Sequence, residues 1–372
     1  MHILVAPQEF KGSLTAVEAA SAIAAGVRRA MAGATVDEAP VSDGGPGLVD
    51  ALIAGRGGER RTITVHDPLM RPIEATWALL PHATAVVEMA AASGLVLLAE
   101  AERDPLAATT SGVGELIVAA LDAGCGNIIV GVGGSATVDA GAGALQALGA
   151  RLLDASGADL DRGGAALADL DRIDLTTIDA RVARAAIRVA SDVRNPLYGP
   201  EGAAVVFGPQ KGASQQAVAT LDAALRRFAE VVQRDFALDL QAIEGSGAAG
   251  GLGAGLLVGT GATIEPGFPI VADAIGLRAR VEAADLVVTG EGRLDSQTAY
   301  GKAAAGVAAV ARECGKPVIA VAGTISDYDP SSLMFDAVMA STPSGMRLED
   351  AMRAGAALVA EAAARLVRDF AR

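Results

Sequence analysis

Short apolar runs alternate with helical periodicity at both ends of the chain. Residues 2–6 form an apolar run that Pro7 ends, and residues 15–31 follow with apolar positions at helical spacing, which predicts a strand, a loop and a helix. The C-terminal third repeats this scheme. Strands are predicted at about 285–289, 317–322 and 335–341, and helices at about 302–314 and 348–370. The stretch that follows the first of these strands, GEGRLDSQTAYGK, is predicted to be a loop. Apolar strands that alternate with helices are typical of a parallel sheet covered on both faces.

The middle of the chain has a different pattern. It predicts three consecutive antiparallel strands, then a helix and a further strand, at 61–66, 73–80, 84–89, 111–124 and 127–132. This order is not that of a doubly wound sheet. We therefore expect two domains: a discontinuous Rossmann-like domain with a parallel sheet, built from residues 1–60 and 267–372, and an inserted mixed α/β domain of residues 61–266. A length of 372 residues agrees with two domains.

Composition disfavours two classes of partner, nucleic acids and membranes. The net charge of −14 disfavours a nucleic-acid partner, because neutralising phosphates requires a basic face. Residues 245–264 carry no charge, but they are too rich in glycine to span a membrane, so no membrane association is expected. A small anionic substrate remains compatible with this charge, because a few local cations suffice to bind it.

The cysteines and the first residues predict the compartment. Cys125 and Cys314 lie far apart and match no metal-binding or redox spacing, so two free thiols and a reducing compartment are expected, with one long-range disulfide as the alternative. The first residues, MHILVAP, lack the features of a signal peptide. These observations predict a cytoplasmic protein.

Lysine is scarce in this chain. Of the 30 basic side chains, 26 are arginines and four are lysines. Lys11, Lys211 and Lys302 stand beside glycine in predicted loops, whereas Lys316 precedes a strand and is expected at the surface. An ammonium is a compact point charge and a guanidinium is a planar fork, so the two are not interchangeable at a phosphate or a carboxylate. The first three lysines are therefore candidates for binding an anion, and chance placement in turns is the alternative.

Four carboxylates fit positions at the ends of strands. They are Asp43 in VSDGGPG, Asp192 in VASDVRNP, and Glu291 and Asp295 in TGEGRLDSQT. Ligands of open α/β sheets bind outside the carboxyl ends of the strands, and phosphoryl transfer needs carboxylates for Mg²⁺ and a base for the acceptor hydroxyl. An acid in a glycine-rich turn often serves merely as a cap. The motif TGEGRLDSQT, however, gathers two acids and Arg293 directly after a buried strand, which favours a functional site.

A glycine-rich stretch, GVGGSATVDAGAG at 131–143, follows a predicted strand and is expected to open a helix. Backbone N–H groups at such a turn can bind an anion, which makes Gly133, Gly134, Ser135 and Thr137 candidates for phosphate binding. The stretch is neither a P-loop nor a dinucleotide fingerprint. Close packing of a helix on a sheet is the alternative explanation of its glycines.

The histidines predict no chemistry. His2, His66 and His82 belong to no common motif, so neither a zinc site nor a Ser-His-Asp triad is expected.

Taken together, the motifs resemble those of the bacterial glycerate kinase family of the first type over almost the whole chain. The matching stretches are PQEFKGSLTA, VSDGG, EMAAASGL, TTSGVGELI, GVGGSAT, SDVRNPLYGPEGAAVVFGPQKGA, GAAGGLGAG and DLVVTGEGRLDSQTAYGK. This resemblance implies a flavodoxin-like domain with an inserted domain likened to restriction endonucleases, in agreement with the split predicted from the elements. It also implies ATP and Mg²⁺ as cofactors and D-glycerate as the substrate, with 2-phosphoglycerate as the product rather than 3-phosphoglycerate.

The chain departs from the family pattern at a few positions. The family's common Asp-Ser is replaced by Gln8-Glu9, a usual Glu by Pro46, and the usual Asn-Asp-Gly after GSAT by Val138-Asp139-Ala140. Lys11, Asp43 and Asp139 are retained, whereas no carboxylate is available at position 46.

The motifs and the resemblance together suggest roles for the candidate residues. The expected catalytic residues are Asp192 or Asp295 as the base and Lys11 as an anion-binding cation. The expected ligands of substrate or phosphate are Arg293, Lys302, Lys211, Gly133, Gly134, Ser135 and Thr137, and the expected magnesium ligands are Asp43 and Glu291. A kinase for another small hydroxy acid and a non-catalytic metabolite-binding protein are the alternatives, and a homo-oligomer is left open.

Overall fold

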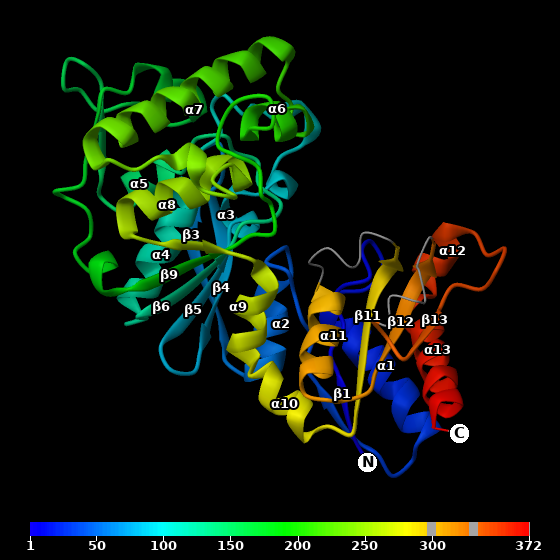
Figure 1. Ribbon diagram of the computed structural model, residues 1–372. Helices are drawn as coiled ribbons and strands as arrows, with labels where there is room; N and C mark the ends of the chain where they lie inside the picture. Colours follow the sequence, from blue (N-terminus) through cyan, green and yellow to red (C-terminus); the bar gives the residue numbers. More distant parts are fainter. Residues whose placement is uncertain (296–302, 327–333, 372) are drawn as a thin grey trace. The chain divides into compact units, whose positions relative to one another are not determined.

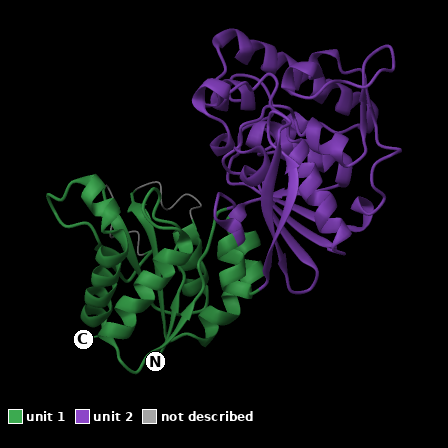
Figure 2. Cartoon of the chain, turned by 180° about the vertical axis from the view of Figure 1, so that it is seen from behind, with its two compact units in different colours: residues 1–43, 50–57, 268–372 green, residues 44–49, 58–267 purple. Residues whose placement is uncertain are grey.

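The computed structural model describes residues 1–295, 303–326 and 334–371 (Figure 1). The chain divides into two compact units (Figure 2). Unit 1 comprises Met1–Asp43, Asp50–Gly57 and Phe268–Arg372, and unit 2 comprises Gly44–Val49 and Gly58–Gly267. The short segment Gly44–Val49 groups with unit 2, although the sequence predicted all of residues 1–60 in one domain.

Unit 1 contains a five-stranded sheet in which all strands are parallel. Its strands are β1 (His2–Val5), β2 (Thr35–Glu38), β11 (Leu286–Leu294), β12 (Val318–Ile325) and β13 (Ala337–Ala340). Their spatial order is β13-β12-β11-β1-β2. Numbered along unit 1, this is the flavodoxin order 2-1-3-4-5, in which the winding reverses between the first and third strands. The reversal here falls between β1 and β11, where ligands of such sheets usually bind.

Helices cover both faces of this sheet. Helices α1 (Ala16–Ala30) and α13 (Gly355–Phe370) lie side by side, and their apolar faces form one core with alternate residues of the strands (Figure 1). Helix α11 (Ala303–Glu313) packs against β11 and β12, and the remaining helices of unit 1 are α9 (Gly267–Ile275), α10 (Leu277–Ala283) and α12 (Leu348–Arg353). Helix α2 (Leu48–Arg56) begins in unit 2 and continues into unit 1.

The start of α1 shows how local sequence sets an element boundary. The Thr15 hydroxyl accepts a hydrogen bond from the Glu18 amide, and the Glu18 carboxylate accepts one from the Thr15 amide at 2.9 Å. This capping box satisfies two amides that no helical carbonyl can reach. It also determines where the chain leaves the loop that follows β1.

Unit 2 contains a six-stranded mixed sheet. Its strands are β3 (Glu59–His66), β4 (Pro72–Leu80), β5 (Thr84–Glu88), β6 (Asn127–Gly131), β9 (Ala186–Ala190) and β10 (Thr263–Glu265), in the order β10-β9-β6-β5-β4-β3. β3, β4 and β5 pair antiparallel, as predicted, whereas β5, β6, β9 and β10 run parallel to one another. Strands β7 (Arg151–Leu153) and β8 (Arg172–Asp174) form a separate antiparallel pair.

The helices of unit 2 complete two apolar cores. They are α3 (Ala90–Ser93), α4 (Ser111–Asp122), α5 (Ala142–Ala147), α6 (Ala203–Phe207), α7 (Gln215–Phe236) and α8 (Leu252–Thr260). Helix α4 packs on β3 and β5, with Trp77 buried beneath it. Helix α7 contributes Phe228 to a second core, which lies over the two-stranded sheet. The mixed α/β class with a parallel sheet is therefore confirmed.

Two predictions of local structure were wrong. β11 does not end at residue 289 but continues to Leu294, because β12 continues beside it and pairs Arg293 with Thr324. The helix predicted at 348–370 is two helices, since Ala354 interrupts it and the Ser13 hydroxyl bonds to the Met352 carbonyl at 3.0 Å. By contrast, the stretch 131–143 follows β6 and ends in the first residues of α5, as expected, with ten residues of irregular backbone between the two elements.

Both cysteines are free thiols, as expected from the sequence. Cys125 is buried and Cys314 is half-buried, and neither forms a disulfide. Among the described residues, no helix combines the length and the apolar character needed to cross a bilayer.

Candidate active site

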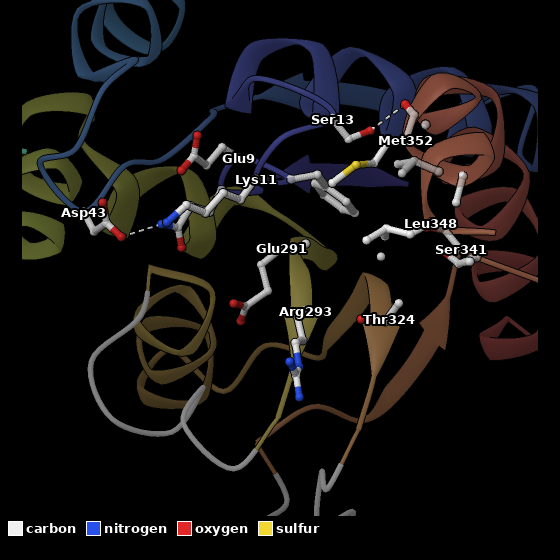
Figure 3. A pocket seen from close by; sticks show the side chains of 18 residues that line it. Glu9, Lys11, Ser13, Asp43, Glu291, Arg293, Thr324, Ser341, Leu348 and Met352 are labelled. Carbon is white, nitrogen blue, oxygen red and sulfur yellow. Dashed lines mark hydrogen bonds between the residues drawn. The ribbon is translucent and has the colours of Figure 1, made fainter. Parts of the chain in front are cut away.

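A cavity of about 540 Å³ opens at the carboxyl end of the unit 1 sheet (Figure 3). The loops after β1 and β2, the ends of β11 and β12, the segment after β13, and helices α12 and α13 contribute its walls. Its polar lining residues are Gln8, Glu9, Lys11, Ser13, Asp43, Glu291, Arg293, Thr324, Ser341 and Thr342. The cavity therefore lies at the winding reversal between β1 and β11, and it includes four residues expected from the sequence: Lys11, Asp43, Glu291 and Arg293.

Glycines bring the loop after β1 against the end of β11. A side chain at Gly292 would stand 3.1 Å from the Lys11 amide, and one at Gly323 would stand 2.3 Å from the Gly292 carbonyl oxygen. The bare backbone at these positions lets three segments approach closely, which is a common reason for glycine at a site. The acid at 291 and the lysine at 11 consequently line the same cavity.

The acidic side chains of the cavity influence one another. Glu9 is half-buried, and burial, followed by repulsion from Asp43, raises the pKa of the Glu9 carboxyl, while Lys11 lowers it. The Gln8 amide donates a hydrogen bond of 2.5 Å to Asp43. Glu291 is 5% exposed and lies on β11 opposite Ala322 of β12. Glu9, Asp43 and Glu291 thus share the cavity with Lys11 and Arg293, an arrangement suited to an anionic ligand that binds together with a metal cation.

We expect Glu9→Gln to stabilise the protein at neutral pH and to have no effect at acid pH. A carboxyl whose pKa is raised on folding is protonated more readily in the folded state, so stability falls as pH rises from its ordinary pKa through the raised value. The neutral amide removes this loss, and solvent screening keeps the gain below about 1 kcal/mol. Urea unfolding of both proteins at pH 7 and near pH 4 measures it. A gain that persists unchanged at the lower pH would contradict the electrostatic cause.

Arg293 and Asp295 lie together at the end of β11. The Arg293 guanidinium contacts the Asp295 carboxylate at 3.3 Å and donates to the Ser326 hydroxyl at 3.0 Å. Arg293 lines the cavity, whereas Asp295 does not. Lys302, the third lysine expected at a site, lies outside the described residues.

Unit 2 buries Lys211 beneath the loop after β6. Lys211 is 1% exposed, and its ammonium donates to the Ser135 hydroxyl and to the Thr137 carbonyl oxygen, both at 2.7 Å. Burial lowers the pKa of Lys211 to about 7, although Asp139 opposes this change. The side chain thus holds the loop from beneath, instead of presenting its charge to solvent as a phosphate ligand would.

Asp139 anchors the same loop. Its buried carboxylate accepts hydrogen bonds from the amides of Thr110, Gly141 and Gly143 and from the Thr110 hydroxyl, at 2.8–3.2 Å. Burial raises the pKa of Asp139, and these four donors oppose the increase. The acid therefore ties the end of the loop, where α5 begins, to Thr110 at the start of α4.

The loop itself leaves part of its surface accessible. Gly134 is exposed, and Gly133 and Ser135 are half-buried. Thr137 is fully buried, and its hydroxyl has no hydrogen-bond partner among the residues that the structure describes. Gly133, Gly134 and Ser135 thus remain available to a ligand, whereas Thr137 contributes from the interior.

Asp192 follows β9 in unit 2. It is exposed, and its carboxylate accepts a hydrogen bond of 2.9 Å from the Gly267 amide. The contact caps the start of α9, which is one ordinary function of an acid at that position.

The carboxylates of the unit 1 cavity decide whether it fits a magnesium ion. Within the described ranges, no group of three or more His, Cys, Asp or Glu side chains is placed to hold a metal by itself. Asp43 and Glu291 nevertheless line one cavity. Mg²⁺ is usually held by one or two carboxylates together with substrate phosphates and water. These residues therefore fit a magnesium ion that is shared with a nucleotide.

Comparison with known proteins identifies the family. The model of the glycerate kinase family matches residues 3–371. This chain belongs to that family. It is 43% identical to the glycerate kinase of Halalkalibacterium halodurans over 97% of its own length and 96% of that protein. It is 47% identical to the glycerate 2-kinase of Escherichia coli over 88% of its own length and 86% of that protein. The predicted family is confirmed, and with it the prediction of a kinase.

The fold is likewise shared with a solved structure. A crystal structure of a Salmonella typhimurium LT2 protein assigned as glycerate kinase 2 matches with a TM-score of 0.91 at 45% identity, covering 100% of this chain and 98% of that one. The arrangement of a flavodoxin-ordered sheet and a second mixed sheet therefore occurs in a relative determined by experiment.

Sequence reasoning missed several residues of the cavity. Glu9 was noted merely as a departure from the family pattern, and Thr324, Ser341 and Thr342 were not noticed. Ser341 ends the strand predicted at 335–341 and Thr342 follows it, so the rule that ligands bind at the carboxyl ends of strands could have identified them.

Proposed function

We propose that the protein transfers the γ-phosphoryl group of ATP to D-glycerate, giving 2-phosphoglycerate. The observation that carries this proposal is the cavity at the winding reversal of unit 1, where Lys11, Asp43, Glu291 and Arg293 meet in a chain of the glycerate kinase family. The name of the Escherichia coli relative, glycerate 2-kinase, favours the 2-isomer.

The proposed reaction comprises three chemical events. A hydroxyl oxygen of glycerate forms a bond to the γ-phosphorus, the bond from that phosphorus to the bridging oxygen of ADP breaks, and the hydroxyl proton passes to a base. Most of the rate enhancement in such transfers comes from positioning and from charge stabilisation. Several residues should therefore contribute moderately.

The cations are proposed to bind the anionic groups. Lys11 and Arg293 line the cavity and would hold the glycerate carboxylate or the transferring phosphate. Lys302 would neutralise the nucleotide phosphates, a role that rests on its sequence context. The proton acceptor is proposed to be Asp295 of unit 1 or Asp192 of unit 2.

Asp43 and Glu291 are proposed to hold Mg²⁺, directly or through water. When bound, the ion would neutralise charge on the phosphate oxygens. The Gln8 amide, which donates to Asp43, would keep that carboxylate oriented toward the cavity.

The glycine loop of unit 2 is proposed to bind a substrate anion through Gly133, Gly134 and Ser135. Because its ammonium is buried and already bonded to Ser135 and Thr137, we assign Lys211 the task of positioning this loop. Thr137 then contributes through its backbone to the same arrangement.

A coupled assay of ADP release tests the function. We expect turnover with ATP and D-glycerate, and rates at least about tenfold lower with L-glycerate, glycolate and lactate, because a site built to pair polar substrate groups rejects analogues that leave them unpaired. Phosphorus NMR of the product distinguishes the 2-isomer from the 3-isomer. Faster turnover of another acid would favour the alternative kinase, and absence of turnover with every acid would favour a binding protein.

A further inference from the structure

The unit 1 cavity has two chemically different ends. Figure 3 places Asp43, Glu9 and Glu291 toward one end, and Leu348, Met352 and Ser341 toward the other. The roles proposed above use the charged end and leave the apolar end without a function.

The apolar wall is exposed to an unusual degree. Leu348 is 63% exposed and Met352 is 37% exposed, although both are large apolar side chains. Both line the cavity, whereas Val359 of α13, behind them, is buried in the core of unit 1. Apolar side chains that remain in contact with water in a concave site mark a surface that a ligand covers.

This wall is held firmly in place. The Ser13 hydroxyl donates to the Met352 carbonyl oxygen at 3.0 Å, and a side chain at Gly355 would stand 2.3 Å from that hydroxyl. The break between α12 and α13 is thereby packed onto the loop after β1. A preformed wall loses little conformational freedom when a ligand binds.

Hydroxyl groups also lie at the apolar end of the cavity. Ser341 and Thr342 line the cavity, and their amides donate to the carbonyl oxygens of Ala322 and Gly323 at 2.7 and 3.1 Å. These backbone bonds extend the pairing of β13 with β12 and hold both residues at the rim. Their side chains can hydrogen-bond to polar edges of a planar ring.

The size and polarity of the cavity decide which substrate fits. A volume of about 540 Å³ lies within the roughly 300–1,000 Å³ usual for small-molecule sites. A three-carbon hydroxy acid is polar throughout and offers nothing to an apolar wall. A nucleoside triphosphate has a flat, largely apolar base at one end and phosphates at the other, which is the same separation that the cavity shows.

We propose that the apolar end of the unit 1 cavity binds the purine base of the nucleotide, with Leu348 and Met352 against the ring. This inference rests on the proposed function, because it takes the charged end as the phosphate end. Ser341 and Thr342 supply hydrogen bonds to the ring or the ribose.

Leu348→Ser tests the proposal without adding charge. Leu348 is largely exposed, so the variant should fold, and Met346→Ser is the matched control because Met346 is an exposed apolar residue of the same segment that does not line the cavity. We expect ADP to bind Leu348→Ser about 5–20-fold more weakly by titration calorimetry, as loss of a leucine contact predicts. Inorganic triphosphate should bind both variants within about twofold of the parent, because it has no base.

Kinetics and direct binding separate this inference from the function on which it rests. In the coupled assay, KM for ATP should rise by a similar factor while KM for D-glycerate stays within about twofold. A rise confined to KM for glycerate would place the acceptor at the apolar end and overturn the proposal, as would unchanged ADP affinity. If the parent protein phosphorylates no acid, the proposed function fails, yet the ADP titration still decides where the base binds.

Discussion

Glu291→Gln should lower kcat/KM for phosphorylation of D-glycerate by roughly 10²–10³-fold, which corresponds to about 3–4 kcal/mol of transition-state stabilisation. Glu291 is buried at the winding reversal and lines the cavity with Asp43, where the proposed magnesium ion would bind. The amide has the same shape but no charge. The variant should therefore fold normally and bind the metal–nucleotide complex poorly.

The dependence on magnesium identifies the cause of the loss. If Glu291 holds the ion, the concentration of Mg²⁺ that gives half-maximal rate should rise at least about tenfold in the variant. Glu361→Gln is the control, because Glu361 pairs with Arg29 on the surface of unit 1, away from the cavity lining, and should stay within about 0.5 kcal/mol of the parent in stability. A similar loss of rate in both variants, or an unchanged magnesium requirement in Glu291→Gln, would remove Glu291 from the metal site.

The fold could be predicted largely because its strands carry clear patterns. β1 and β12 are apolar runs bounded by proline or glycine, and the antiparallel strands β3 to β5 alternate with short turns. β11 was underestimated because its second half, GEGRL, has the composition of a turn. Its strand conformation depends on pairing with β12 and on close backbone approach at Gly292, and neither contact can be read from local sequence.

The residues of the candidate site were likewise predictable only in part. Asp43, Glu291 and Lys11 stand out in sequence because of their glycine-rich surroundings, and the structure gathers them in one cavity. Glu9 and Ser341 have no such context. They reach the cavity because β1 and β13 run in the same direction and therefore end at the same edge of the sheet, which follows from how the strands pair rather than from any motif.

Lys211 shows how composition can single out a residue without revealing its task. The scarcity of lysine made it a candidate phosphate ligand, but the structure buries its ammonium against Ser135 and Thr137. A positioning residue of this kind acts through the loop that it holds. Its replacement should change catalysis and the pH dependence of stability in ways that loss of a phosphate ligand would not.

Lys211→Met should lower kcat about 10²-fold and change KM for ATP by less than about threefold, because the loop loses its support while the ligand loses no direct contact. Lys211→Arg should not rescue the rate, since a site that leaves the lysine 1% exposed has no room for a planar guanidinium. Lys316→Met, at a half-buried lysine outside both sites, is the control and should behave like the parent. A large rise in KM for ATP, or partial rescue by arginine, would indicate direct phosphate binding.

The difference in stability between the parent and Lys211→Met should grow with pH. Burial lowers the pKa of Lys211 to about 7, whereas the unfolded lysine keeps its proton to about pH 10.4. Between these values the unfolded state binds one more proton, so the free energy of unfolding of the parent should rise with pH relative to Lys211→Met, by on the order of 2–4 kcal/mol. Urea unfolding of both proteins at pH 6, 8 and 10 measures this, and groups common to both cancel in the difference. A difference that is constant over this range would mean that Lys211 titrates normally, and that the loop is open to solvent where the structure closes it.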